Sequence, residues 1–126
     1  MIQERIKNFT ELKTWQFGHQ IVLEVYFLTK FFPREERFGL TNQLRRAAVS
    51  VTSNIAEGFS RATSKDKSHF YTIALGSLTE VQNQLIIARD LGYIAESTFV
   101  EITVRIVETI RMTQGLVKSA FSRISP

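Results

Sequence analysis

The chain has 126 residues, 44% of them hydrophobic, which suits one folded domain with a real core and is too short for two ordinary domains. It contains no cysteine, which excludes disulfides and thiolate metal sites and permits a reducing compartment, so we expect a cytoplasmic protein. Its 16 Lys and Arg against 12 Asp and Glu give a net charge of +4, which permits a nucleic-acid partner without requiring one.

Residues 1–12 are mixed and charged, and we interpret them as an N-terminal arm or short extra turn. The first long helix is predicted from Lys13 to Phe32, because Pro33 lacks a backbone donor and disfavours helix in the residue before it. Its core stripe is expected at Trp15, Val22, Tyr26 and Thr29. This segment is the most apolar of the chain, but charged and polar residues interrupt it, so no membrane span is expected: His19, Glu24 and Lys30.

The second helix, within Phe38–Phe59, carries two distinct faces at helical spacing. One is an apolar core stripe: Leu40, Leu44, Ala47, Val51, Ile55 and Phe59. The other is a polar ridge: Gln43, Arg46, Ser50, Ser53, Asn54 and Glu57. Because Ser and Asn are poor helix formers on a solvated face, this ridge favours a close contact with another helix or subunit. The alternative is an ordinary exposed face.

The third helix is predicted from Ser64, its expected N-cap, to the left-handed exit at Gly92. Its core stripe is Phe70, Ala74, Leu78, Val81, Leu85 and Ala88. The fourth begins near Glu96 and fades by Ser122, with the stripe Phe99, Ile102, Ile106, Ile110, Val117 and Phe121. Short connections force antiparallel neighbours, so residues 13–122 are predicted to form an all-α, up-down-up-down four-helix bundle, followed by a tail of residues 123–126.

Several motifs in this order carry a resemblance to a known family: Leu12–Gln16, Phe32–Pro33, Glu36–Thr41, Gln43–Ser50, Ser53–Phe59 and Ala74–Glu80. The chain resembles the four-helix-bundle family of intervening sequences in bacterial large-subunit ribosomal RNA genes, to which accessory variability proteins of diversity-generating retroelements are related. The resemblance implies a homopentameric barrel without enzymatic activity. It also implies nucleic-acid binding for the retroelement relatives, which act with a reverse transcriptase.

Two departures from the family pattern concern packing. Thr52 stands where the family often has proline, so a proline-associated kink is in doubt. Phe17, Phe27 and Phe31 stand where relatives tend to be polar, which makes the first helix apolar nearly all round. We expect these phenylalanines to pack under the arm or a neighbouring subunit, rather than against a membrane or a foreign protein.

Catalytic and metal-binding chemistry finds little support in the sequence. His19 lies on the expected core stripe, and His69 follows Asp66 by one helical turn, but a di-metal bundle site needs a second such pair. No nucleophile elbow or phosphate-cradling glycine loop is present in the sequence. We therefore predict no enzyme, no metal and no cofactor.

The predicted nucleic-acid-binding residues are cationic: Arg45, Arg61, Lys65 and Lys67. In a pentamer, a charge of +4 per chain amounts to about +20, so repeated patches would engage one polyanion together. Arg45 and Arg46 have a competing role, because either can pair with Glu57 or Glu80 in a subunit contact. The polar ridge is the predicted subunit interface.

The first functional hypothesis is a homo-oligomeric module that binds RNA or DNA phosphates and docks a reverse transcriptase or another nucleic-acid enzyme. The alternative is a protein-interaction scaffold that displays the aromatic face of the first helix to a partner protein, with the positive charge incidental.

Overall fold

The computed structural model describes residues 5–124, which form four long helices: α1 (Lys13–Thr29), α2 (Leu40–Ser60), α3 (Ser64–Asp90) and α4 (Glu96–Phe121). Two short 3-10 helices precede α1 and α2, namely η1 (Phe9–Glu11) and η2 (Arg34–Glu36). Residues 5–124 contain no strand, which confirms the all-α prediction. The outermost parts of the predicted arm and tail, residues 1–4 and 125–126, lie outside the described residues.

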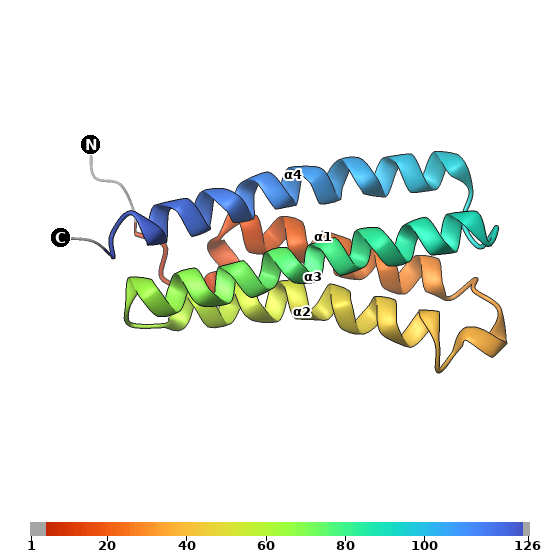
Figure 1. Cartoon of the computed structure of the whole chain (residues 1–126), viewed down its shortest axis with the longest axis horizontal. Coiled ribbons are helices and arrows are strands. Elements are labelled where there is room, and N and C mark those ends of the chain that lie inside the picture. The colour runs from red at the N-terminus through yellow and green to blue at the C-terminus, as the bar shows by residue number, and fades with distance from the viewer. Residues whose placement is uncertain (1–4, 125–126) are drawn as a thin grey trace.

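The four helices run alternately up and down and lie side by side, as Figure 1 shows. α2 packs most extensively against α3, and each helix contacts its two neighbours in the order α1, α2, α3, α4. The α1–α2 and α3–α4 connections meet at one end of the bundle, and the α2–α3 connection lies at the other end, with the start of α1 and the end of α4 (Figure 1). The predicted bundle topology is therefore confirmed for one chain, while the pentameric barrel stays a prediction.

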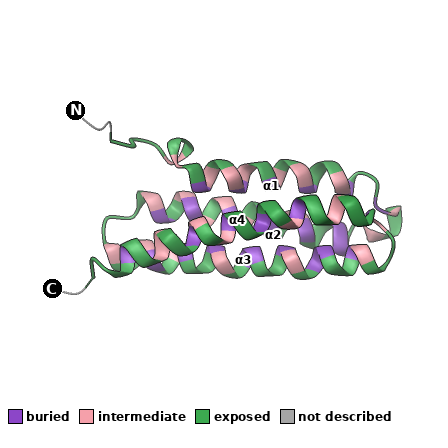
Figure 2. Cartoon of the chain, turned by 90° about the horizontal axis from the view of Figure 1, so that it is seen from above, coloured by how far each residue is buried: buried purple, intermediate pink, exposed green. Residues whose placement is uncertain are grey.

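The core is a continuous apolar column enclosed by all four helices, visible in Figure 2 as the buried strip of each helix. The predicted stripe of α2 is buried from Leu40 to Ile55, and Phe59 at its end is half-buried. The stripe of α3 is likewise buried from Ala74 to Ala88. On α4, Ile102 and Ile106 are fully buried, but the prediction for Phe121 was wrong, because its side chain is 66% exposed near the end of the helix.

The predicted core stripe of α1 was rotated away from the true one. Ile21 and Val25 are fully buried, whereas Trp15 and Val22 are half-buried and Tyr26 is 40% exposed. Only Thr29 of the predicted stripe is buried. The reason is the close approach of α1 to α2 at a glycine: a Cβ at Gly18 would lie 3.2 Å from Thr52 Cγ2 and 3.4 Å from Val51 Cγ1.

Two helix boundaries differ from the predictions. α1 ends at Thr29, and the amides of Lys30, Phe31 and Phe32 donate to carbonyls three residues earlier, a tightened last turn ahead of Pro33. The N-cap of α3 is Thr63, whose Oγ1 accepts a 3.1 Å hydrogen bond from the Asp66 amide, so Ser64 is the first helical residue. The left-handed exit at Gly92 is confirmed by its φ of 80°.

The described part of the N-terminal arm contains the short turn that the sequence suggested. Asn8 caps η1 by accepting a 2.9 Å hydrogen bond from the Thr10 amide. The Phe9 ring then packs edge-on against Trp15, with 5.4 Å between the ring centroids. Within residues 5–124, none of the helices combines the length and the apolar character that crossing a bilayer requires.

Candidate functional site

Lys67 marks a concentration of positive charge at the end of the bundle where α2 turns into α3. Its ammonium group donates hydrogen bonds to the carbonyls of Phe59, at 2.6 Å, and Gly58, at 3.3 Å. The last carbonyls of a helix have no partner within it and form the negative end of its dipole, so Lys67 closes the C-terminus of α2. This predicted nucleic-acid-binding residue thus has a structural role as well.

Arg123 belongs to the same end of the bundle, although the sequence prediction missed it. Burial, and secondly the positive charge of Arg123, lower the pKa of Lys67 from its usual range. We call Arg61, Lys65, Lys67 and Arg123 the Arg61 cluster. The helical spacing of α4 does not indicate that Arg123 lies near the α2–α3 connection. This placement follows only from the antiparallel order of the four helices, which brings the end of α4 to the same end of the bundle.

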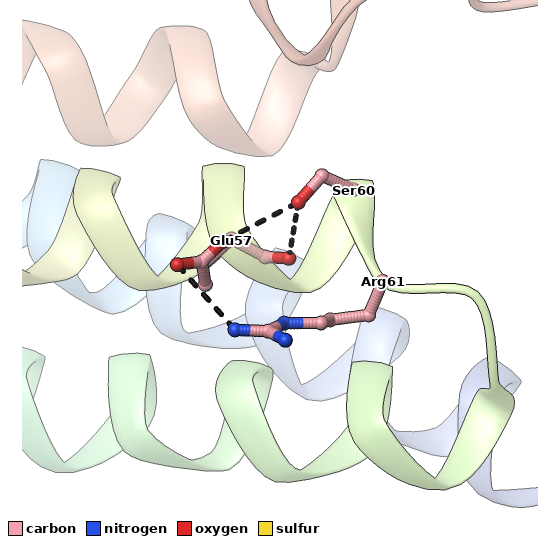
Figure 3. A network of polar contacts seen from close by, with 3 residues as sticks. All are labelled: Glu57, Ser60 and Arg61. Carbon is pink, nitrogen blue, oxygen red and sulfur yellow. Dashed lines mark hydrogen bonds and ion pairs between the residues drawn. The ribbon is translucent and has the colours of Figure 1, made fainter.

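Arg61 lies just after α2, and its guanidinium turns back along the helix, as Figure 3 shows. It lies 3.5 Å from Oε1 of Glu57, and the other carboxylate oxygen, Oε2, accepts a 3.4 Å hydrogen bond from Ser60 Oγ. The guanidinium carbon stands 4.5 Å above the Phe70 ring. Both charged side chains are substantially exposed, so the ion pair contributes only about 0–1 kcal/mol and a phosphate can displace the carboxylate.

Arg45 stands apart from the other predicted binding residues, near the opposite end of α2. Arg61 follows the end of α2, so the two residues are separated by a rise of about 24 Å along the helix. The Nε of Arg45 donates a 2.8 Å hydrogen bond to Thr29 Oγ1, and its guanidinium carbon lies 4.6 Å from the centre of the Tyr26 ring. The structure therefore groups Arg61, Lys65 and Lys67, and places Arg45 against α1.

The predicted polar ridge of α2 divides into a packed part and an exposed part. Ser50 and Asn54 are half-buried, and the Ser50 hydroxyl lies 2.8 Å from that of Ser77 on α3. The Asn54 amide donates to Ser50 Oγ at 3.0 Å and to the Ser50 carbonyl at 2.8 Å. The remaining members are exposed in the single chain: Gln43, Arg46, Ser53 and Glu57. Part of the packing that the small residues suggested is therefore supplied by α3 of the same chain.

A polar groove runs between α2 and α3 beside this ridge. It encloses about 460 Å³ and is lined by Asn42, Gln43, Arg46, Ala47, Ser50, Glu80 and Gln84. Gln84 is only 8% exposed, and its Oε1 accepts no hydrogen bond from the described residues. A buried acceptor without a hydrogen bond costs about 1–3 kcal/mol, so binding of a hydrogen-bond donor in the groove would be favoured.

Within residues 5–124, Arg46 has no acidic partner within 4.0 Å, and the predicted pairing with Glu57 or Glu80 is absent from the single chain.

The two histidines are engaged with aromatic rings. His19 is half-buried and stacks on Trp15 with 4.8 Å between the ring centroids. His69 is exposed and meets the edge of Phe70 at 5.4 Å. In the part of the chain that the structure describes, no three His, Cys, Asp or Glu residues gather closely enough to hold a metal ion.

The fold and the basic α2–α3 connection define a small antiparallel four-helix-bundle protein. The family model of the 23S rRNA-intervening sequence protein matches residues 10–115, and the chain belongs to that family. A crystal structure of a protein with unknown function from the S23 ribosomal protein family of Bacteroides thetaiotaomicron is similar in fold, with a TM-score of 0.77 and 20% sequence identity. The match covers 83% of this chain and 98% of the other. No curated protein sequence matches the chain significantly.

Proposed function

We propose that this chain is a non-enzymatic, homo-oligomeric module that binds the phosphate backbone of RNA or DNA. The observation that carries the proposal is the Arg61 cluster, in which cations from the end of α2, the start of α3 and the C-terminal segment share one end of the bundle. Lys65 and Arg61 are exposed, so they can meet a polyanion without rearrangement of the core. The net charge of +4 per chain also favours the attraction of a polyanion.

The oligomeric part of the proposal rests on the exposed half of the polar ridge. Ser53 is a small polar residue on the outer side of α2, where a solvated helix more often carries Lys or Glu. A sister chain packed there would repeat the Arg61 cluster around a ring, which raises avidity without any new contact. The resemblance to retroelement accessory proteins supports a homopentamer and the docking of a reverse transcriptase or another nucleic-acid enzyme.

Fluorescence anisotropy with labelled single-stranded RNA, over a series of salt concentrations, tests nucleic-acid binding. The logarithm of affinity should fall linearly with the logarithm of salt concentration, because each neutralised phosphate releases counterions. The double variant Arg61→Gln/Lys65→Gln should reduce the slope by about 1 to 2 for each engaged chain. Lys67 is left in place because it closes α2.

A matched control removes two positive charges elsewhere, as Arg105→Gln/Arg111→Gln on α4. This variant should bind RNA with nearly the wild-type slope. Equal weakening by both double variants would show that net charge alone drives binding and would reject the Arg61 cluster as the site. Absence of binding by the wild-type protein at low salt would reject the function itself.

One observation favours the alternative function, a protein-interaction scaffold. Phe27 on α1 and Phe31 in the turn that follows it are 57% and 69% exposed, with their rings in an edge-to-face contact at 5.4 Å. Phe17 is half-buried and lines a hollow with Gln20. If a protein docks on this face, Phe31→Ser and Phe17→Ser should abolish its capture in a pull-down while the oligomer and RNA binding persist.

A further inference from the structure

A second basic site lies at the opposite end of the bundle, where α1 leads into α2. It is a hollow of about 640 Å³, which we call the Arg37 pocket, lined by Thr29, Lys30, Phe32, Pro33, Arg34, Arg37, Thr41 and Arg45. Four of these eight residues are cationic and none is acidic. The size lies within the range of small-molecule sites, which is about 300–1,000 Å³.

The acidic residues of the same connection form no ion pair with the cations of this pocket. Glu36 uses both carboxylate oxygens elsewhere: Oε1 accepts from the Leu40 amide at 3.1 Å, and Oε2 accepts from the Tyr93 hydroxyl at 2.8 Å. Glu35 is exposed and is not part of the lining. Across residues 5–124, no carboxylate lies within 4.0 Å of the charged nitrogens of the four cations.

Arg45 is held in a fixed orientation inside the pocket. The hydroxyl of buried Thr29 accepts a 2.8 Å hydrogen bond from Arg45 Nε and donates a 2.7 Å hydrogen bond to the Val25 carbonyl. The Tyr26 ring packs against the guanidinium at 4.6 Å. Nη1 and Nη2 make no hydrogen bond with the described residues, so the planar fork can still bind two phosphate oxygens at once.

The other three cations line the same pocket as the anchored Arg45 guanidinium. Lys30, Arg34 and Arg37 are exposed: Lys30 lies in the tightened turn after α1, Arg34 begins η2 and Arg37 follows η2 directly. Their long side chains can close around an anion, whereas the Arg45 fork stays in place. A phosphomonoester or diphosphate carries several charges and several acceptor oxygens, and therefore suits four cations better than a carboxylate does.

We propose that the Arg37 pocket binds a terminal phosphate group, either that of a free nucleotide or that at the 5′ end of a nucleic acid. Arg45 is the preorganised ligand, and Thr29 is the positioning residue that fixes it. The proposal is independent of RNA binding by the Arg61 cluster, because the two sites lie at opposite ends of the bundle (Figure 1).

Isothermal titration calorimetry of the full chain with inorganic pyrophosphate and with ADP, at low ionic strength, tests the site. Arg34→Gln and Arg37→Gln replace exposed residues, and each should weaken pyrophosphate binding about tenfold, since a charged hydrogen bond is lost. The control Arg61→Gln removes an equal charge at the other end and should leave the affinity unchanged. No binding by the wild-type protein at millimolar pyrophosphate, or equal weakening by Arg61→Gln, would overturn the proposal.

The role of Thr29 is tested by two substitutions, one that removes its hydroxyl at nearly the same size and one that keeps the hydroxyl. Thr29→Val removes the hydroxyl that holds Arg45 and should weaken pyrophosphate binding several-fold, whereas Thr29→Ser keeps the hydroxyl and should restore it. Equal affinities for the two variants would overturn the positioning role. Melting curves of both variants report stability separately from affinity.

The source of the phosphate is decided with RNA oligonucleotides that differ only at the 5′ end. Tighter binding of the 5′-phosphorylated RNA than of the 5′-hydroxyl RNA, lost in Arg37→Gln, supports the end of a nucleic acid. Binding of ADP without this preference supports a free nucleotide. Failure of both probes, with the salt-dependent RNA binding intact, would overturn the Arg37 pocket and leave the proposed function standing.

Discussion

Replacing Gly58 with alanine should weaken the contact between α2 and α3, which is the most extensive in the bundle. A Cβ at this position would lie 2.6 Å from Tyr71 Cε1, 2.8 Å from Tyr71 Cδ1 and 3.3 Å from Phe70 Cβ. Tyr71 is buried, so its ring cannot move aside without disturbing its neighbours.

The expected magnitude combines two opposing effects. Overpacking of this kind costs about 1–3 kcal/mol. Alanine regains about 1 kcal/mol through its better helix propensity. The net effect is a destabilisation of about 1 kcal/mol, which lowers the melting temperature of a 126-residue chain by about 4 °C.

Thermal denaturation followed by far-ultraviolet circular dichroism, at one fixed protein concentration, measures this change. The matched control is Gly76→Ala in α3, where an added Cβ meets nothing within 4 Å and should stabilise the protein by up to about 1 kcal/mol. A Gly58→Ala variant that melts at or above the wild-type temperature would refute the close helix approach at this position.

Three further substitutions test the core and the polar contacts. Ile106→Ala removes a fully buried side chain and should cost about 2–5 kcal/mol in urea denaturation; a loss below that range would contradict tight packing. Ser77→Ala removes the hydroxyl facing Ser50 and should cost about 1 kcal/mol, measured in the same way, whereas an unchanged midpoint would show that the bond contributes nothing. The hydrogen bond to Glu36 raises the pKa of Tyr93, so the native state keeps its phenolic proton longer than the unfolded state. Stability should therefore fall as the pH rises above about 10. The Tyr93→Phe variant should lack this component of the fall in melting curves, and an identical pH profile would contradict it.

The bundle could be predicted because α2, α3 and α4 each separate an apolar stripe from a polar face. On α1 the same reasoning failed, because apolar residues surround the helix and several stripes fit the period equally well. The decisive feature is Gly18, which lets α1 approach Thr52 of α2 and thereby buries Ile21 and Val25. This contact depends on residues of α2, and the hydrophobic periodicity of α1 alone gives no information about them.

The candidate sites were partly predictable for a similar reason. Arg61, Lys65 and Lys67 are close in sequence, so their grouping was visible at once. The addition of Arg123 and the capping role of Lys67 depend on how the chain returns to the same end.

The Arg37 pocket has only a weak local signal in the sequence. Its cations occur within one short stretch of the chain, but Glu35 and Glu36 lie among them and balance part of their charge when residues are counted along the sequence. In the structure Glu36 pairs with none of these cations, because its two carboxylate oxygens accept hydrogen bonds from the Leu40 amide and the Tyr93 hydroxyl. A count of charges along the sequence does not show which carboxylates form hydrogen bonds elsewhere in the fold.

Sedimentation velocity of the protein mixed with labelled single-stranded RNA tests the proposed function most directly. At about 50 mM salt the RNA should sediment with a protein species that is a multiple of the 14.5 kDa chain, and at about 200 mM salt much of it should be released. RNA that sediments alone at the lower salt concentration, or with a single 14.5 kDa chain, would contradict a homo-oligomeric phosphate-binding module.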